Sequence, residues 1–263
     1  MLNKLIYFFF ILLFSIQINV LAQSPYNLNY EREGLVLGIG TIGGITSLVA
    51  NSKISPLTTT EINLLNKNNI NGFDRYATNY YSPDIAMVSN LTVLTMMATP
   101  ALFLCSPEIR NDYLTVGTMY AETMLLAVVL PQFSKGFVNR TRPYAFNRNA
   151  PMGDKIEADT RRSFFSSHTT VAFASAAFIS KVYSDYYPDS EYTPYILSGS
   201  MFVATTTGLL RIFSGKHFPT DVLTGAVVGS FIGWFIPELH KKTVSQNVSI
   251  NVGIEGISIC YMF

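Results

Sequence analysis

Six apolar blocks of helical length constrain the fold of this chain more than any other feature. They lie at residues 35–50, 85–105, 114–133, 171–183, 196–213 and 222–236. None shows the apolar–polar alternation between turn signals that is typical of a half-buried strand. Only 13% of the 263 residues are charged, against about 25% in an ordinary soluble domain. The sequence therefore predicts an all-α, six-helix bundle that is hydrophobic and membrane-embedded.

The N-terminal segment has the pattern of an export signal. Lys4 precedes an almost wholly apolar run at residues 5–16, and small residues around Ala22 offer a cleavage site. We expect a signal peptide at 1–22, and an uncleaved membrane anchor is the alternative.

Three further segments follow the signal peptide. We expect an N-terminal helix and a polar loop at 23–83, the helical core at 84–240 and a β tail at 241–263. The polar stretch at 51–83 predicts one short helix near residues 60–66 and little other structure. In the tail, apolar residues alternate on both sides of Gly256, which predicts a small β-hairpin. An outer-membrane targeting strand is the alternative interpretation of this tail.

Three glycines, Gly225, Gly229 and Gly233, are spaced four residues apart in the last apolar block. On a helix they line one face, where another backbone can approach closely. The spacing predicts tight packing of this helix, whether the bundle lies in lipid or in water.

Net charge and cysteine content exclude several classes of function. A formal net charge of +1 gives no reason to expect a nucleic-acid partner. Cys105 and Cys260 are the two cysteines, too few for a disulfide framework and without the spacing of a zinc site.

His168 lies at the expected start of a helix. Ser166 and Ser167 precede it, and either hydroxyl can cap the helix that begins near Thr169. A helix start presents free N–H groups and the positive end of the dipole, which favour an anion. The segment is therefore a candidate phosphate site with a proton donor, or else a plainly capped helix.

His217 precedes the last helix, which Pro219 is suited to begin. Asp221 follows four residues later, so that the two side chains can share a face. A carboxylate beside an imidazole stabilises the charge that forms when the ring attacks an electrophile. Arg211, six residues earlier, is placed to bind an anion between the helices. A helix-end salt bridge is the simpler alternative.

Three cations, Lys135, Arg140 and Arg142, follow the third apolar block. Cations at the C-terminal end of a helix are favourable for the helix dipole alone, and for Arg140 we keep that interpretation. The polar loop at 144–162 that follows is a candidate substrate loop.

Taken together, these segments resemble the motifs of the type 2 phosphatidic acid phosphatase superfamily. Its pattern is Lys, six residues and Arg-Pro; then Pro-Ser-Gly-His; then Ser-Arg, five residues, His, three residues and Asp. The corresponding segments here are 135–143, 165–168 and 210–221, in the same order and with both long spacings intact. The resemblance covers roughly residues 84–236. Phe165, Ser167 and Leu210 depart from the pattern, and none of them removes a charged group.

The resemblance implies a phosphatase that needs no metal or cofactor. It implies that His217 is the nucleophile and forms a phosphohistidine, that Asp221 orients this ring, and that His168 protonates the leaving group and then activates water. It also implies that the phosphoryl oxygens are held by Lys135, Arg142, Ser166, Ser167 and Arg211.

The expected substrate is a phosphorylated lipid, such as a phosphatidate-like lipid, polyprenyl phosphate or lipid A, which makes the membrane a partner. We expect an exported protein whose active site faces the periplasm. A soluble periplasmic acid phosphatase of the same superfamily is the first alternative, and a related vanadium haloperoxidase is a second. A third is a metal-binding membrane protein without activity, which the positive charge around the histidines disfavours.

Overall fold

The structure, a computed structural model, describes residues 24–242, 248–253 and 256–261. The predicted signal peptide at 1–22 lies outside these residues. A long helix covers each of the apolar blocks, except that the second block, 85–105, extends beyond its long helix into a short 3-10 helix. These helices are α2 (Tyr30–Ser52), α5 (Pro83–Ala98), α7 (Tyr113–Val138), α9 (Ser167–Tyr186), α10 (Thr193–Phe213) and α11 (Pro219–His240).

Short helical elements join the long helices. They are α3 (Thr59–Leu64), η1 (Lys67–Asn69), α4 (Gly72–Arg75), η2 (Tyr76–Asn79), η3 (Thr99–Cys105), α6 (Pro107–Asn111), η4 (Pro143–Phe146), α8 (Met152–Lys155) and η5 (Ala158–Arg161). The expectation of a single short helix between residues 51 and 83 is wrong. Asn66 and Asn71 cap two further helical turns there, because their side chains accept hydrogen bonds from backbone N–H groups of η1 and α4.

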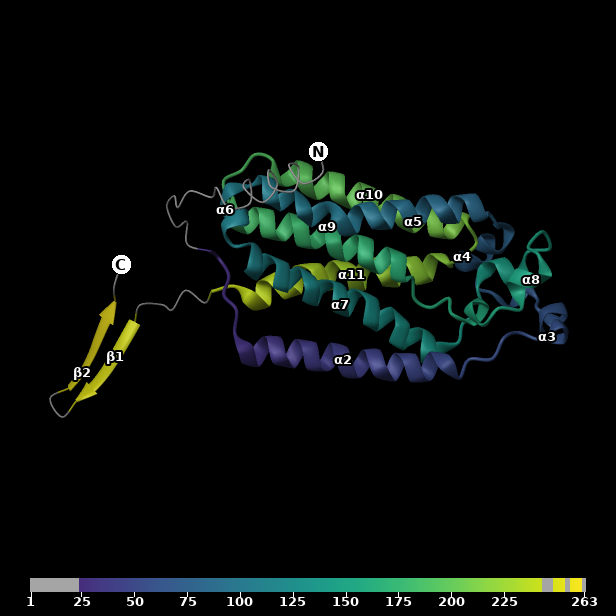
Figure 1. The fold of residues 1–263 in the computed structure, drawn as a ribbon, viewed down its shortest axis with the longest axis horizontal. Helices are drawn as coiled ribbons and strands as arrows, with labels where there is room; N and C mark the ends of the chain where they lie inside the picture. The colour runs from purple at the N-terminus through teal and green to yellow at the C-terminus, as the bar shows by residue number, and fades with distance from the viewer. Residues whose placement is uncertain (1–23, 243–247, 254–255, 262–263) are drawn as a thin grey trace, which may run out of the picture.

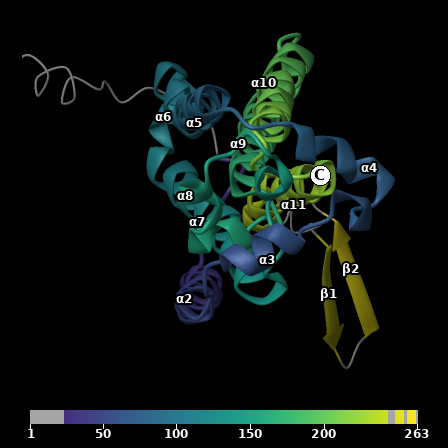
Figure 2. The same ribbon diagram turned by 90° about the vertical axis from the view of Figure 1, so that its right-hand side faces the viewer.

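The long helices run up and down, with α9 in the middle of the bundle. Seen end-on, α5, α7, α10 and α11 surround α9, and α2 lies outside against α7 (Figure 2). The C-terminal ends of α7 and α10 therefore meet the N-terminal ends of α5, α9 and α11 at one end of the bundle (Figure 1). Helix starts and cationic helix ends converge there, which suits that end to binding an anion.

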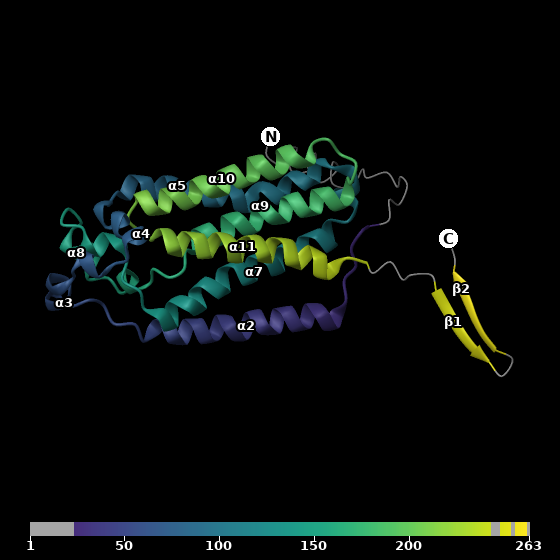
Figure 3. The same ribbon diagram turned by 180° about the vertical axis from the view of Figure 1, so that it is seen from behind.

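Helix α11 lies directly beside α9, as Figure 3 shows from behind, and its glycine face packs on α9. A Cβ atom on Gly229 would lie 2.2 Å from the carbonyl oxygen of Thr170, and one on Gly233 would lie 2.2 Å from that of Ala174. The close approach predicted from the glycine spacing is confirmed. This contact fixes the start of α11 beside the start of α9.

The outer surface of the bundle is apolar. Among the described residues, five helical segments are long and apolar enough to cross a membrane: 30–52, 83–105, 113–146, 193–213 and 219–240. On α2, Leu35, Ile42 and Leu48 expose more than half of their surface. Apolar side chains on the outside of a bundle are favourable in lipid and unfavourable in water. The chain is therefore a membrane protein by the character of its surface.

Two short strands follow the bundle. β1 (Val248–Gly253) pairs antiparallel with β2 (Gly256–Tyr261), in a register that joins Val248 to Tyr261 and Gly253 to Gly256.

Candidate active site

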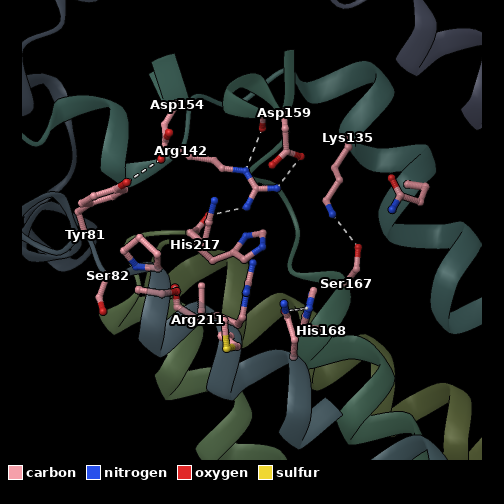
Figure 4. A pocket seen from close by; sticks show the side chains of 17 residues that line it. Tyr81, Ser82, Lys135, Arg142, Asp154, Asp159, Ser167, His168, Arg211 and His217 are labelled. Atoms are coloured by element: carbon pink, nitrogen blue, oxygen red, sulfur yellow. Dashed lines mark hydrogen bonds and ion pairs between the residues drawn. The ribbon is translucent and has the colours of Figure 1, made fainter. Parts of the chain in front are cut away.

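A cavity of about 550 Å³ opens at the end of the bundle where these helix ends converge. Its polar lining includes Lys135, Asp159, Ser167, His168, Arg211 and His217, together with Arg142 (Figure 4). Segments far apart in the sequence thus bring most of the predicted site residues to one place. Of the predicted site residues, all of which the structure describes, Asp221 and Ser166 do not line the cavity.

A tight turn between α10 and α11 sets the position of His217. Gly215 has φ +73°, and a Cβ atom there would lie 2.2 Å from the carbonyl oxygen of Tyr80. Only glycine combines that conformation with so close an approach. The backbone N–H groups of Lys216 and His217 both donate to the carbonyl oxygen of Arg211, at 3.1 Å. The turn therefore brings His217 and Arg211 to the same wall of the cavity.

The imidazole of His217 is 1% exposed, and its partners define which nitrogen can react. Nδ1 lies 2.7 Å from the carbonyl oxygen of Ser163 and 3.6 Å from Oδ2 of Asp221. A carbonyl oxygen only accepts, so Nδ1 carries the proton and Nε2 keeps its lone pair. The backbone of Ser163 thus sets the tautomer, and it lies nearer to Nδ1 than Asp221, the residue that the resemblance implied would orient this ring.

Asp221 is fully buried behind His217. Its Oδ2 accepts hydrogen bonds from the Ser163 hydroxyl at 2.5 Å and from the backbone N–H of Phe218 at 2.9 Å. The bond to Phe218 caps α11, because Asp221 is the third residue of that helix. The carboxylate therefore holds both the start of α11 and the Ser163 segment that contacts His217.

Arg140 is part of this network, so its assignment to the helix dipole alone is wrong. Its Nη1 lies 2.5 Å from Oδ1 of Asp221, and its Nη2 lies 2.7 Å from Oδ2 of Asp74. Both carboxylates are 0% exposed. Thr220 also donates to Asp74, through its backbone N–H at 3.0 Å and its hydroxyl at 2.7 Å. Packing of α4 against the start of α11 creates this arrangement, which no local sequence pattern reveals.

Three buried cations surround the position that an anion would occupy. Lys135, Arg142 and Arg211 are 6%, 5% and 5% exposed. The Lys135 ammonium donates to the hydroxyl of Ser167 at 2.6 Å, and Nη1 of Arg211 donates to the hydroxyl of Ser89 at 2.9 Å. The Nε atom of Arg211 is buried without a hydrogen-bond partner in the described structure. Buried donors of this kind favour an anionic ligand that supplies the missing acceptors.

Arg142 is held by the loop at 144–162. Its Nε donates to the carbonyl oxygen of Asp159 at 2.9 Å, and its Nη2 pairs with the carboxylate of the same residue at 2.9 Å (Figure 4). Its Nη1 donates to the carbonyl oxygen of Lys216 at 3.3 Å. The predicted substrate loop therefore supplies a counter-ion that fixes the guanidinium before any ligand binds.

The polar groups at the start of α9 have two roles: one caps the helix, and the others line the cavity. Ser166 is the N-cap residue and is fully buried; its hydroxyl accepts from the backbone N–H of Thr169 at 3.4 Å. Ser167 and His168 line the cavity. The Nε2 atom of His168 donates to the side-chain oxygen of Asn90 on α5, at 2.8 Å.

Both cavity histidines have lowered pKa values. Burial, followed by the charges of Arg142, Arg211 and Lys135, moves the pKa of His217 well below its usual range. Burial and the same cations lower the pKa of His168 to about 3. Burial and the neighbouring Arg142 also lower the pKa of Lys216. In the free site both imidazoles are neutral near pH 7, and the field is positive.

The residues of the site network that escaped the sequence analysis include Asp74, Asn90, Asp159 and Ser163. None belongs to a recognisable motif, and three lie in loops or short elements whose position depends on the tertiary fold. For Asp159 alone the sequence provided an indication, because the loop that contains it is polar and lies between two motifs.

Comparison with known proteins places the site segments in one family. Residues 116–245 match the model of the PAP2 superfamily, and this range contains all the predicted site residues. The lipid A 1-phosphatase of Porphyromonas gingivalis is 31% identical over 128 residues, 46% of this chain and 25% of that protein. The human phospholipid phosphatase-related protein type 4 is 26% identical over 137 residues, 51% of this chain and 18% of that protein. The chain thus spans a quarter or less of the length of these relatives.

Two solved structures are also similar to the chain. One is LpxE of Aquifex aeolicus, with a TM-score of 0.42 and 22% identity, covering 62% of this chain and 92% of that one. The other is the transmembrane PAP2 type phosphatidylglycerolphosphate phosphatase of Bacillus subtilis, with a TM-score of 0.42 and 17% identity, covering 76% and 94%. The family match confirms the resemblance seen in the three motifs, and the chain belongs to the PAP2 superfamily.

Proposed function

We propose that the protein is a phosphatase that removes phosphate from lipids through a phosphohistidine on His217. One observation carries the proposal. The Ser163 carbonyl holds the proton on Nδ1 of His217, which leaves an unprotonated Nε2 in a cavity lined by three buried cations. A neutral imidazole is a nucleophile, and fixed positive charge stabilises a transferring phosphoryl group without a metal ion.

The proposed reaction has two steps. Binding of the anionic substrate offsets the neighbouring cations and raises the pKa of His168, so that its ring takes up a proton. Nε2 of His217 then forms a bond to phosphorus while the bond from phosphorus to the leaving oxygen breaks, and that oxygen takes the proton from the His168 ring. A water molecule then attacks the phosphohistidine as His168 accepts its proton, the P–N bond breaks, and inorganic phosphate leaves. Lys135, Arg142 and Arg211 hold the equatorial oxygens through both steps.

The lining and the exterior of the bundle favour a lipid over a soluble ester. Pro83, Ala86 and Met87 line one wall of the cavity on α5, and Met87 is 64% exposed on the outside of the bundle. A phosphate bound to the cations would therefore have an apolar surface beside it, where an acyl or prenyl chain can lie. The lipid A 1-phosphatase relative also supports a phosphorylated lipid as the substrate.

Hydrolysis by the purified full-length protein in detergent tests the proposal. Phosphatidate, polyprenyl diphosphate and lipid A would be compared with p-nitrophenyl phosphate by phosphate release. We expect at least one lipid to react with a kcat/KM well above that of the soluble ester, and His217→Ala to show none of this activity. Equal use of the soluble ester would favour an acid phosphatase, and turnover by His217→Ala would refute the mechanism.

We also propose that the site faces the periplasm. Cys105 is exposed at the end of η3, at the opposite end of the bundle from the cavity. A periplasmic site then places Cys105 and the start of α2 on the cytoplasmic side. Cleavage after Ala22, followed by crossing of every long helix, would give the reverse orientation.

Labelling of cysteines in intact cells distinguishes the two orientations. Asn149 is exposed in the loop beside the cavity. In a Cys260→Ser background, a membrane-impermeant maleimide should label Asn149→Cys and leave Cys105 unlabelled until the cells are opened. Labelling of Cys105 alone would contradict the proposal.

A further inference from the structure

A second cluster of ionisable side chains lies at the other end of the bundle from the cavity. Glu33 comes from the first turn of α2, Glu122 from α7 and His240 from the last turn of α11. The start of α2 and the end of α11 lie at the same end of the bundle (Figure 1). One nitrogen of His240 and one oxygen of each carboxylate lie within 4.8 Å of one another.

The ring of His240 points a lone pair at two carboxylates. Nδ1 lies 2.8 Å from the carbonyl oxygen of Ile236, which only accepts, so Nδ1 carries the proton of a neutral ring. Nε2 lies 3.0 Å from Oε1 of Glu33 and 3.3 Å from Oε2 of Glu122, and neither contact has hydrogen-bond geometry. Three acceptor atoms therefore face one another, which is unfavourable unless a cation lies between them.

Glu122 is the member of the cluster that most needs a neighbouring cation. The residue is 1% exposed, and both of its carboxylate oxygens lack a hydrogen-bond partner in the part of the chain that the structure describes. Its neighbour Glu33 is already compensated, because Nη2 of Arg32 lies 2.9 Å from Oε1 of Glu33. A buried carboxylate that lacks both a counter-ion and a hydrogen-bond donor is strongly unfavourable.

We propose that Glu33, Glu122 and His240 bind a divalent transition-metal ion of the zinc class. A tetrahedral ion with bonds of about 2.1 Å separates its ligand atoms by about 3.4 Å, close to the 3.0 and 3.3 Å found here. Imidazole nitrogen with carboxylate oxygens suits zinc better than magnesium or calcium. The contact of Nδ1 with the Ile236 carbonyl is the second partner that a metal-binding histidine usually has.

The ion would join three helices that are far apart in the sequence. It ties the outer helix α2 to α7 and α11 at the end of the bundle away from the cavity. Its role is therefore structural, and its loss should loosen α2 without removing a catalytic group.

Zinc binding by the full-length protein tests the inference. After treatment with a chelator and addition of Zn²⁺, metal analysis of the dialysed protein should give one zinc per chain, with a raised unfolding temperature. Glu122→Gln keeps the shape of the side chain and should weaken zinc binding by at least about tenfold and abolish the thermal shift. His240→Gln should do the same.

Two controls make the result decisive. The double variant His168→Gln, His217→Gln lacks the cavity histidines and should still bind one zinc. Loss of zinc from this variant would place the ion in the cavity and overturn the inference. Absence of zinc from the wild-type protein would also overturn it. The phosphatase activity of Glu122→Gln is measured separately, because loss of the zinc site removes no catalytic group. Zinc binding and the proposed phosphatase function can therefore fail independently.

Discussion

Nδ1 of His217 lies 2.7 Å from the backbone carbonyl oxygen of Ser163. A backbone acceptor cannot be protonated at ordinary pH, so this contact keeps the proton on Nδ1 under all conditions in which the fold persists. Asp221, at 3.6 Å from the same nitrogen, supports the arrangement by binding the hydroxyl of Ser163.

The contact predicts which nitrogen becomes phosphorylated. Brief reaction with a ³²P-labelled substrate followed by denaturation should give an acid-labile, base-stable label attached to Nε2 of His217. His168→Ala should keep this label longer, while steady-state turnover falls by about 10²–10⁴-fold, because both proton transfers lose their carrier. A label on Nδ1, or on a different residue, would contradict the assignment.

Arg140 is predicted to act as a positioning residue. Arg140→Ala removes the shared partner of Asp74 and Asp221, two buried carboxylates, and should destabilise the fold by about 3–5 kcal/mol. Because Arg140 does not line the cavity, we expect kcat to fall by about tenfold or more with little change in KM.

The conservative variant separates positioning from a general loss of folding. Arg140→Lys keeps one charge but cannot reach both carboxylates as a fork does. It should recover much of the stability, measured by thermal unfolding in detergent, and only part of kcat. A rise in KM with unchanged kcat would instead place Arg140 in contact with the substrate.

Anion binding should be accompanied by proton uptake. The pKa of His168 is lowered to about 3 by burial and three cations, so the free site holds a neutral ring at pH 6. A bound dianion offsets those cations and raises this pKa, and protons are then taken up from solution. Sulfate is the useful probe, because it stays a dianion from about pH 4 to 9.

Calorimetry of sulfate binding in buffers of different ionisation enthalpy measures this uptake directly. We expect a positive proton count at pH 5–6 that decreases towards pH 8, as the ring of the complex loses its proton. His168→Gln should lower the count. An equal count in wild-type and variant would assign the uptake to other groups.

Gly229→Ala should damage the bundle although alanine is the better helix former. The added Cβ atom would lie 2.2 Å from the carbonyl oxygen of Thr170, so α11 must move away from α9. We expect a loss of about 1–3 kcal/mol and a fall in activity, because the start of α11 carries Asp221.

Gly199→Ala is the matched control. Gly199 lies within α10, and a Cβ atom there would meet nothing within 4 Å. This variant should be more stable by about 0.5–1 kcal/mol. Equal effects of the two substitutions on the unfolding temperature would show that the close approach of α9 and α11 is not needed.

The sequence by itself determined the long helices, the glycine face of α11 and six of the residues that line the cavity. Apolar periodicity over many residues is a local signal, and the glycine spacing records a contact on one helix face. The spacing from Lys135 to Arg142, and from Arg211 through His217 to Asp221, sufficed to identify the family.

Only the tertiary structure decided how these residues are held. The contacts of Ser163 with His217, of Arg140 with Asp74 and Asp221, and of Asn90 with His168 join residues that lie 54 to 81 positions apart in the sequence. At least one partner in each pair carries no local sequence pattern, because its role depends on which helix ends meet. The cluster of Glu33, Glu122 and His240 arises in the same way, from three helices whose packing brings buried acceptors together.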